Sequence, residues 1–319
     1  MQRSIIKMSD RSHGITLPRQ WLNDHDLSKG DTVGLEILDN CLHVSSPNFK
    51  KDADPKTVSF DLRGCNKSAI EDALTAPYRF GYDKIILKFD EKCIDVWDNH
   101  KEIETREVIQ NKCLQLLGFE CLELNKTSAI VRGIMEVTSK EFDLLLQRLF
   151  LLTYMSAKDI HTALKDKDQD KVRFIISQFY DMGKYERYCL RFLNKIGKGK
   201  NTALYTHLIS KLGLARSALL YVVKLKEDTN IKEEYSKQVL DLIKEAADLI
   251  KEVHTNYKNF SIKRQSELLA KRQNLMQQMF RFSEGKNRAD AIVSQRLLYV
   301  MSSVSWIMNM SLAMSLEGN

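Results

Sequence analysis

Residues 4–22 read SIIKMSDRSHGITLPRQWL, and this stretch decides the class of the first segment of the chain. A strand is predicted over residues 4–8, with Arg3, Ile5 and Lys7 on one face, which is basic, and Ile6 and Met8 on the other. Residues 10–14 have the composition of a turn, and residues 15–17 are predicted to form a second strand. Pro18 suits the start of a helix, where its missing N–H costs no hydrogen bond. The predicted order is strand, turn, strand and short helix.

A β-hairpin is predicted to follow, after a turn at residues 28–31. Apolar residues alternate on both sides of an Asp39-Asn40 turn, at Val33, Leu35, Ile37, Leu42 and Val44. Strands this short bury too little apolar surface to be stable by themselves. We therefore expect a second copy of the chain to complete this segment.

This order of elements resembles the AbrB/SpoVT family of swapped-hairpin DNA-binding domains. The matching positions are Ser4-Ile5-Ile6, Gly14-Ile15-Thr16-Leu17-Pro18, Leu27, Gly30-Asp31-Thr32-Val33 and Leu42-His43-Val44. The resemblance implies that residues 1–46 form half of a dimeric β-barrel, in which two copies interleave their hairpins. It also implies that basic side chains of this segment contact DNA, namely Arg3, Lys7, Arg11, His13 and Arg19. Trp21 departs from the family, in which a basic or small residue is common at that position.

The charge of residues 1–46 qualifies this interpretation. Five Lys/Arg stand against six Asp/Glu, so the segment has no overall positive charge to attract DNA. DNA binding therefore requires the charges to be sorted by face, and solvated surface residues are the alternative interpretation.

A small α/β middle domain is predicted at residues 57–137, after a linker at residues 45–54. Helices are predicted at residues 66–76, just before Pro77, and at residues 102–117. Strands are predicted at residues 58–62, 84–89, 119–124 and 128–137. The order β-α-β-α-β-β predicts a small sheet with helices on one face.

Residues 138–319 have the apolar period of six helices, with breaks near residues 165–170, 197–201, 227–231, 256–261 and 283–288. The breaks divide the region into two successive groups of three helices, which suggests an internal repeat. The whole chain is therefore predicted to be an α+β multidomain protein: half of a swapped-hairpin barrel, a small α/β domain and two all-α three-helix bundles.

The helical region resembles PhoU, a family of phosphate-uptake regulators built from tandem three-helix repeats. The clearest match is Asp181-Met182-Gly183-Lys184-Tyr185-Glu186-Arg187-Tyr188, which follows an acidic turn at residues 166–170. A hairpin DNA-binding segment before such a region also resembles archaeal PhoU-type regulators. The family's metal motif, E-x-x-x-D, is missing, because Leu212 and Arg216 stand there. We therefore expect no metal cluster.

Other site chemistries are not supported by the sequence. Asp166, Asp168 and Asp170 begin like a calcium loop, but Lys171 and Ser177 replace the glycine and the glutamate that such a loop needs, so a helix-capping turn is expected instead. The three histidines of the helices, at positions 161, 207 and 254, lack partners at ligand spacing and are expected to be surface or packing residues. No phosphate loop or catalytic triad is found, so we expect neither enzymatic activity nor a cofactor.

The cysteines and the last helix bear on localisation. Six cysteines without a C-x-x-C pair fit buried thiols in a reducing cytoplasm. Residues 297–316 contain no charge and are long enough to span a membrane, but five serines and Asn309 dilute their hydrophobicity. A buried helix is the preferred interpretation of this segment.

The basic charge of the chain is concentrated in residues 138–319, which contain thirty Lys/Arg against twenty Asp/Glu. Two groups form a candidate partner surface, and their members are Lys195, Lys198, Lys200, Lys263, Arg264, Lys271 and Arg272. Such groups can face DNA phosphates, an anionic membrane surface or an acidic partner, and a solvated helix face is the simpler alternative.

Two functional hypotheses follow. The first is a homodimeric DNA-binding regulator of phosphate uptake, whose PhoU-like region senses phosphate status or receives it from a transporter. The second is an adaptor that contacts a phosphate transporter subunit or a signalling kinase and uses its hairpin segment only to dimerise. An antitoxin is a weaker third idea, because such proteins usually carry a short disordered tail rather than a long helical region.

Overall fold

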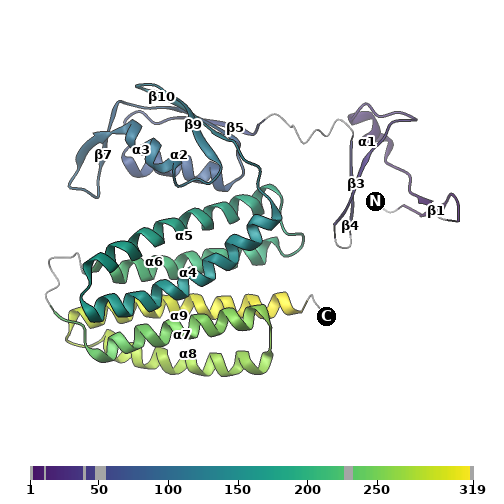
Figure 1. Ribbon diagram of the computed structural model, residues 1–319. Helices are drawn as coiled ribbons and strands as arrows, with labels where there is room; N and C mark the ends of the chain where they lie inside the picture. Colours follow the sequence, from purple (N-terminus) through teal and green to yellow (C-terminus); the bar gives the residue numbers. More distant parts are fainter. Residues whose placement is uncertain (1–2, 11, 39–40, 47–54, 226–232, 317–319) are drawn as a thin grey trace. The chain divides into compact units, whose positions relative to one another are not determined.

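The protein is of the α+β class, with small sheets in its N-terminal part and a helical C-terminal region (Figure 1). The computed structural model describes residues 3–10, 12–38, 41–46, 55–225 and 233–316. The chain divides into two compact units, Met1–Pro55 and Lys56–Asn319, and the division follows directly after the predicted linker.

The N-terminal unit contains two short antiparallel pairs and one helix. β1 (Ile6–Lys7) pairs with β2 (His13–Gly14), and β3 (Gly34–Leu38) pairs with β4 (Cys41–Ser45) as the predicted hairpin. The helix α1 (Arg19–Asp24) begins directly after Pro18, as predicted. The turn residues 39–40 lie outside the described residues. No closed barrel is formed by the part of this unit that the structure describes.

The second strand of this unit was predicted two residues too late. Residues 15–17 are not a strand, because β2 already ends at Gly14. The backbone N–H groups of Met8 and Ser9 both donate to the carbonyl of Ser12, which closes a tight turn. Pairing therefore begins immediately after the turn, and only Ile6–Gly14 and Lys7–His13 are in register.

The middle domain (residues 57–137) is built on a four-stranded sheet in the order β5-β6-β10-β9. The strands are β5 (Thr57–Asp61), β6 (Lys84–Lys88), β9 (Phe119–Leu124) and β10 (Ser128–Gly133). β5 and β6 are parallel, so they need the crossover helix α2 (Lys67–Arg79) between them. Figure 1 shows α2 and α3 (Thr105–Cys113) on the same face of this sheet, where the buried side chains of alternate strand positions form the core.

Three predicted helix boundaries in this domain were wrong. α3 ends at Cys113 rather than at residue 117, because the N–H groups of Gln115 and Leu116 donate to carbonyls three residues back, a tighter turn that ends the helix. α2 continues past Pro77 to Arg79, because Pro77 lies in the last turn and its missing N–H removes only one helical hydrogen bond. α3 begins at Thr105 rather than at residue 102, because Lys101–Glu104 forms the strand β8, which pairs with β7 (Lys92–Asp95). The last strand also ends at Gly133, four residues before its predicted end.

Six helices follow in the described part of the helical region (residues 138–319), as the apolar period predicted. They are α4 (Ser139–Asp166), α5 (Gln169–Lys195), α6 (Thr202–Lys224), α7 (Lys237–Lys258), α8 (Ile262–Ser283) and α9 (Arg288–Ser315). The side chain of Asp168 accepts a hydrogen bond from the backbone N–H of Lys171, so the acidic turn caps α5 as expected. α4 packs against α5 and α7, and α6 packs against α5 and α9, around one shared core.

The last helix contributes a full face to this core. Leu297, Val300, Val304 and other residues of α9 are buried against the neighbouring helices. Arg288–Ser315 is the one helix in the described residues that is long and apolar enough to cross a membrane. Its buried face is that of a core helix in a folded protein.

The described cysteine side chains are free thiols; Cys93, Cys113 and Cys189 are buried as predicted, but Cys65 and Cys121 are only half-buried. Burial raises the pKa of the Cys113 thiol to about 12, so this group stays protonated and unreactive. The side chain of Cys41 lies outside the described part of the chain.

Candidate DNA interface and cationic sites

The N-terminal unit buries none of the apolar side chains that the structure describes in it: some are largely exposed and the rest are half-buried. Those that are largely exposed are Ile5, Ile6, Met8, Ile15, Leu35 and Leu42. Both clusters of buried apolar residues lie beyond residue 61, so the described residues of this unit contribute to neither. An apolar surface of this kind is usually covered by another protein surface.

Four of the five predicted DNA-contacting residues are exposed in the described residues. Lys7 and His13 face each other as register partners of β1 and β2, while Arg3 precedes β1 and Arg19 begins α1. The ammonium of Lys7 donates to the carboxylate of Asp10 at 2.7 Å, but both side chains are mostly exposed, so this pair is weak. Arg11 lies outside the described residues. The structure therefore brings two of the five together and leaves their charges accessible.

The basic group after α5 is engaged with neighbouring acids. Lys195 donates to Asp83, and Lys198 donates to Asp143 and Ser139, both at 2.9 Å. Lys200 is exposed on the same turn. These contacts hold the start of the helical region together, so Lys195 and Lys198 offer less positive charge to a partner than the sequence indicated.

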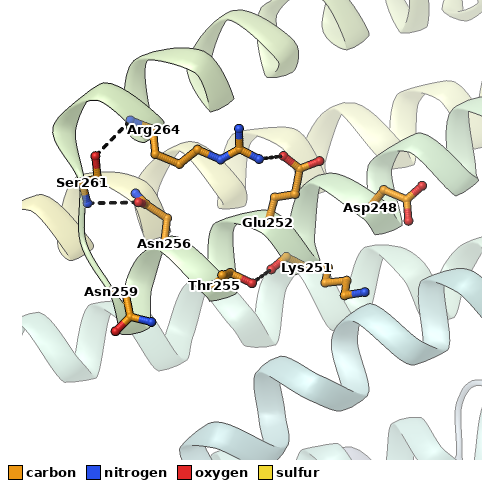
Figure 2. Close-up of a pocket in the computed structure, with 8 residues that line it drawn as sticks. All are labelled: Asp248, Lys251, Glu252, Thr255, Asn256, Asn259, Ser261 and Arg264. Atoms are coloured by element: carbon orange, nitrogen blue, oxygen red, sulfur yellow. Dashed lines mark hydrogen bonds and ion pairs between the residues drawn. The ribbon is translucent and has the colours of Figure 1, made fainter.

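The basic group on α8 also has protein partners. Arg264 donates to the carboxylate of Glu252 on α7, beside a polar cavity of about 530 Å³ (Figure 2). Lys271 donates to the same carboxylate. The Nε of Arg272 donates to the carbonyl of Met301 at 2.7 Å, and burial lowers the pKa of this guanidinium. Lys263 is exposed. This group therefore connects α8 to α7 and α9.

A cluster of arginines around one glutamate was not anticipated from the sequence. Glu186 on α5 is buried, and its carboxylate lies 3.6 Å from Arg79 of α2 and 3.3 Å from Arg216 of α6. Arg187 follows Glu186 and donates to the backbone and side-chain oxygens of Gln115, both at 3.3 Å. Burial, followed by the repulsion from Arg79, lowers the pKa of Arg187 to about 10. Two guanidinium groups thus share one carboxylate, and the third has only the oxygens of Gln115 as partners.

Part of this cluster had a signal in the sequence. Glu186 and Arg187 belong to the stretch that resembles PhoU, and Arg216 stands where that family has an acid of its metal motif. The helical pattern alone did not reveal that Arg79 meets them, because that residue belongs to a different domain and lies far away in the sequence.

The described part of the chain contains no candidate metal-binding site. No group of three or more His, Cys, Asp or Glu side chains lies together there as candidate ligands.

Comparison with known proteins gave no match: no family model, no curated protein and no solved structure resembles the chain closely enough to be assigned.

Proposed function

We propose that this protein is a homodimeric DNA-binding transcriptional regulator of phosphate uptake, with its DNA contacts in the N-terminal unit. In this proposal the helical region is a PhoU-like sensor or partner-binding module made of two three-helix repeats. The observation that carries the proposal is the exposed apolar surface of the N-terminal unit next to its exposed cations.

Dimerisation is supported by the short strands and the uncovered side chains. Paired strands of two and five residues do not form a stable sheet alone, and Leu35 and Leu42 of the hairpin are both largely exposed. A second copy that interleaves its hairpin would cover these side chains and complete the barrel of the swapped-hairpin family. The occupant of this surface is therefore a second N-terminal unit.

DNA binding is supported by the positions of the cations rather than by their number. Lys7 and His13 lie opposite each other on the first strand pair, and dimerisation would double this basic patch. Phosphate contacts from exposed cations position a protein on DNA and make its affinity dependent on salt.

The role of the helical region is supported by its helix order and by its resemblance to PhoU. α4–α6 and α7–α9 are successive groups of three, and equivalent helices pack together, α4 with α7 and α6 with α9. The resemblance supplies the link to phosphate uptake.

Dimerisation can be tested by light scattering after gel filtration. The full chain should have the mass of a dimer, and Leu35→Asp should produce a monomer with an unchanged helical circular-dichroism signal. The control Leu214→Asp places the same charge on an exposed leucine of α6 and should leave the dimer intact. A wild-type monomer would contradict the proposal.

The DNA contacts can be tested with a triple variant, Arg3→Ala, Lys7→Ala and Arg19→Ala. We expect weaker binding to DNA and a shallower dependence of the binding constant on salt, because fewer counterions are released. A matched control removes three exposed cations of the helical region, Lys158, Lys165 and Arg173. Equal losses in the two variants would argue against a DNA interface in the N-terminal unit.

The adaptor function is the second candidate, and one surface favours it. α6 and α9 together expose Leu214, Tyr221, Tyr299 and Trp306 along a shared groove. Exposed aromatic residues of this kind are enriched where proteins bind one another. If the chain binds no DNA, this groove is the surface on which to test transporter or kinase contacts.

A further inference from the structure

A cavity of about 550 Å³ lies between the middle domain and the helical region, within the second compact unit. α2, α3 and the end of β7 line one side, and α5 and α6 line the other. Five cations and three carboxylates line it, which are Lys67, Lys112, Arg187, Arg216, Lys224, Glu71, Asp95 and Asp98. Its volume is in the range of small-molecule sites, and its position between domains is typical of them.

The charges in this cavity are only partly compensated. Lys67 has a close partner, because its ammonium lies 2.6 Å from the carboxylate of Asp95. Lys112 is poorly matched, since its side chain is only 11% exposed and its nearest carboxylate, on Glu71, lies 3.4 Å away. Burial lowers the pKa of Lys112, in keeping with an ammonium that has lost water and has one distant carboxylate partner.

The two arginines of the cavity are also incompletely matched. Within the described residues, no carboxylate lies within ion-pair distance of Arg187, whose partners are the two oxygens of Gln115. Arg216 shares Glu186 with Arg79, and its buried Nε has no hydrogen-bond partner. Buried cations without full partners are costly, so a site that keeps several of them has positive charge available for an anion.

Two aromatic side chains stand at the same cavity. Trp97 lies in the turn after β7 and is 90% exposed, which is unusual for so large an apolar side chain. Tyr180 of α5 is also exposed, and the ammonium of Lys224 lies 5.9 Å from its ring centre. Flat aromatic faces beside cations suit a ligand that carries a ring as well as an anionic group.

We propose that this cavity binds the phosphoryl group of a small ligand, held by Arg187, Arg216 and Lys112. Guanidinium groups match the oxygens of a phosphoryl group through paired hydrogen bonds, and a lysine adds a point charge. The bound anion compensates the cations that the protein leaves unmatched. Free phosphate and a mononucleotide share this chemistry, and Trp97 offers a stacking face only to the second. The inference does not depend on whether the N-terminal unit binds DNA.

The test is isothermal titration of the full-length protein with inorganic phosphate and, separately, with AMP at low ionic strength. We expect at least one of them to bind and Arg187→Met to weaken that binding by about 10- to 100-fold, because a charged hydrogen-bonding partner is lost. Lys112→Met should weaken it in the same direction. The matched control is Arg173→Met, which removes an exposed arginine of the same helix outside the cavity and should bind like the wild type.

Thermal unfolding separates a ligand site from a structural role. Without anions, Arg187→Met should melt no lower than the wild type, because the substitution removes repulsion among the three arginines. The binding anion should then raise the melting temperature of the wild type but not of the variant. Stronger binding of AMP than of phosphate, lost in Trp97→Leu/Tyr180→Leu, identifies the nucleotide as the source, and equal binding identifies free phosphate.

Two results would overturn the proposal. One is that neither phosphate nor AMP binds to the wild type. The other is that binding survives unchanged in both Arg187→Met and Lys112→Met.

Discussion

Arg191 connects the middle domain to the helical region through one buried guanidinium. Its side chain is 3% exposed and donates to the carbonyls of Tyr78 and Tyr82 and to the carboxylate of Asp83, at 2.8 Å from the last. The planar guanidinium also lies over the ring of Phe119, with 4.7 Å between its central carbon and the ring centre. A lysine could not make this set of contacts, because it has neither the fork of donors nor the flat face.

Replacing Arg191 by methionine should destabilise the protein by about 2–4 kcal/mol, because two carbonyls lose their buried donor while Asp83 keeps only the ammonium of Lys195. The free energy of unfolding can be measured with urea. The control is Arg173→Met, which replaces an exposed arginine near the start of the same helix. This variant should unfold like the wild type. A wild-type value for Arg191→Met would show that the two parts do not depend on this contact.

His254 is the residue whose titration should be visible in the stability of the fold. Its ring stacks on Phe150 at 4.6 Å between ring centres, and burial lowers its pKa to about 4. The expected packing role of this histidine is thereby confirmed. Between about pH 6.5 and pH 4 the unfolded chain takes up a proton that the folded chain does not, so stability falls as the pH falls through this window.

Comparison with His254→Phe should isolate this effect, since phenylalanine keeps the stack and cannot titrate. We expect the wild type to lose on the order of 1–2 kcal/mol more than the variant between pH 7 and pH 4, allowing for the partial exposure of the ring. Chemical unfolding at the two pH values measures the difference. Parallel losses in both proteins would mean that His254 is not buried as a neutral ring.

The contact between α5 and α6 depends on a glycine. A Cβ on Gly213 would lie 2.6 Å from the carboxyl carbon of Glu186, so the buried glutamate reaches α6 only because this position has no side chain. Glycine otherwise weakens a helix by about 1 kcal/mol relative to alanine. The position therefore has a packing reason to be glycine.

Gly213→Ala should destabilise the protein despite its better helix propensity, by about 1–3 kcal/mol for overpacking. Glu186→Ala removes the group that collides, so the double variant should regain part of the loss made by Gly213→Ala. Urea unfolding of the two single variants and the double variant gives the coupling between the positions. If Gly213→Ala is stabilising alone, α5 and α6 do not approach as closely as described.

The elements that sequence could predict are those with a regular apolar period or a capping residue. α4–α9 have long periods and polar N-caps such as Thr138 and Asp168. Four of their breaks fall where expected, and the one predicted at residues 227–231 lies outside the described residues. β7 and β8 were missed because they are short and rich in charge, with Lys92 paired to Glu102 across the hairpin. The cationic cavity could not be predicted either, since it depends on residues from two domains that meet only in the folded chain.

The two compact units differ in whether their described residues form a buried apolar core. Lys56–Asn319 contains both clusters of buried apolar residues, whereas the described apolar side chains of the N-terminal unit are exposed or half-buried. Residues 56–319 should therefore fold without the N-terminal unit, with the helical content and cooperative unfolding of that part of the full chain. Circular dichroism of residues 56–319 checks this expectation, and a non-cooperative melt would contradict it.

The most direct test of the regulator function compares the full chain with residues 56–319 for binding to the DNA upstream of its own gene. Fluorescence anisotropy across a salt series, with unrelated DNA as competitor, separates sequence preference from general attraction to phosphates. We predict that the full chain binds the upstream DNA preferentially and that residues 56–319 lose this preference. Equal binding by the two proteins, or no preference in the full chain, would contradict the proposed function.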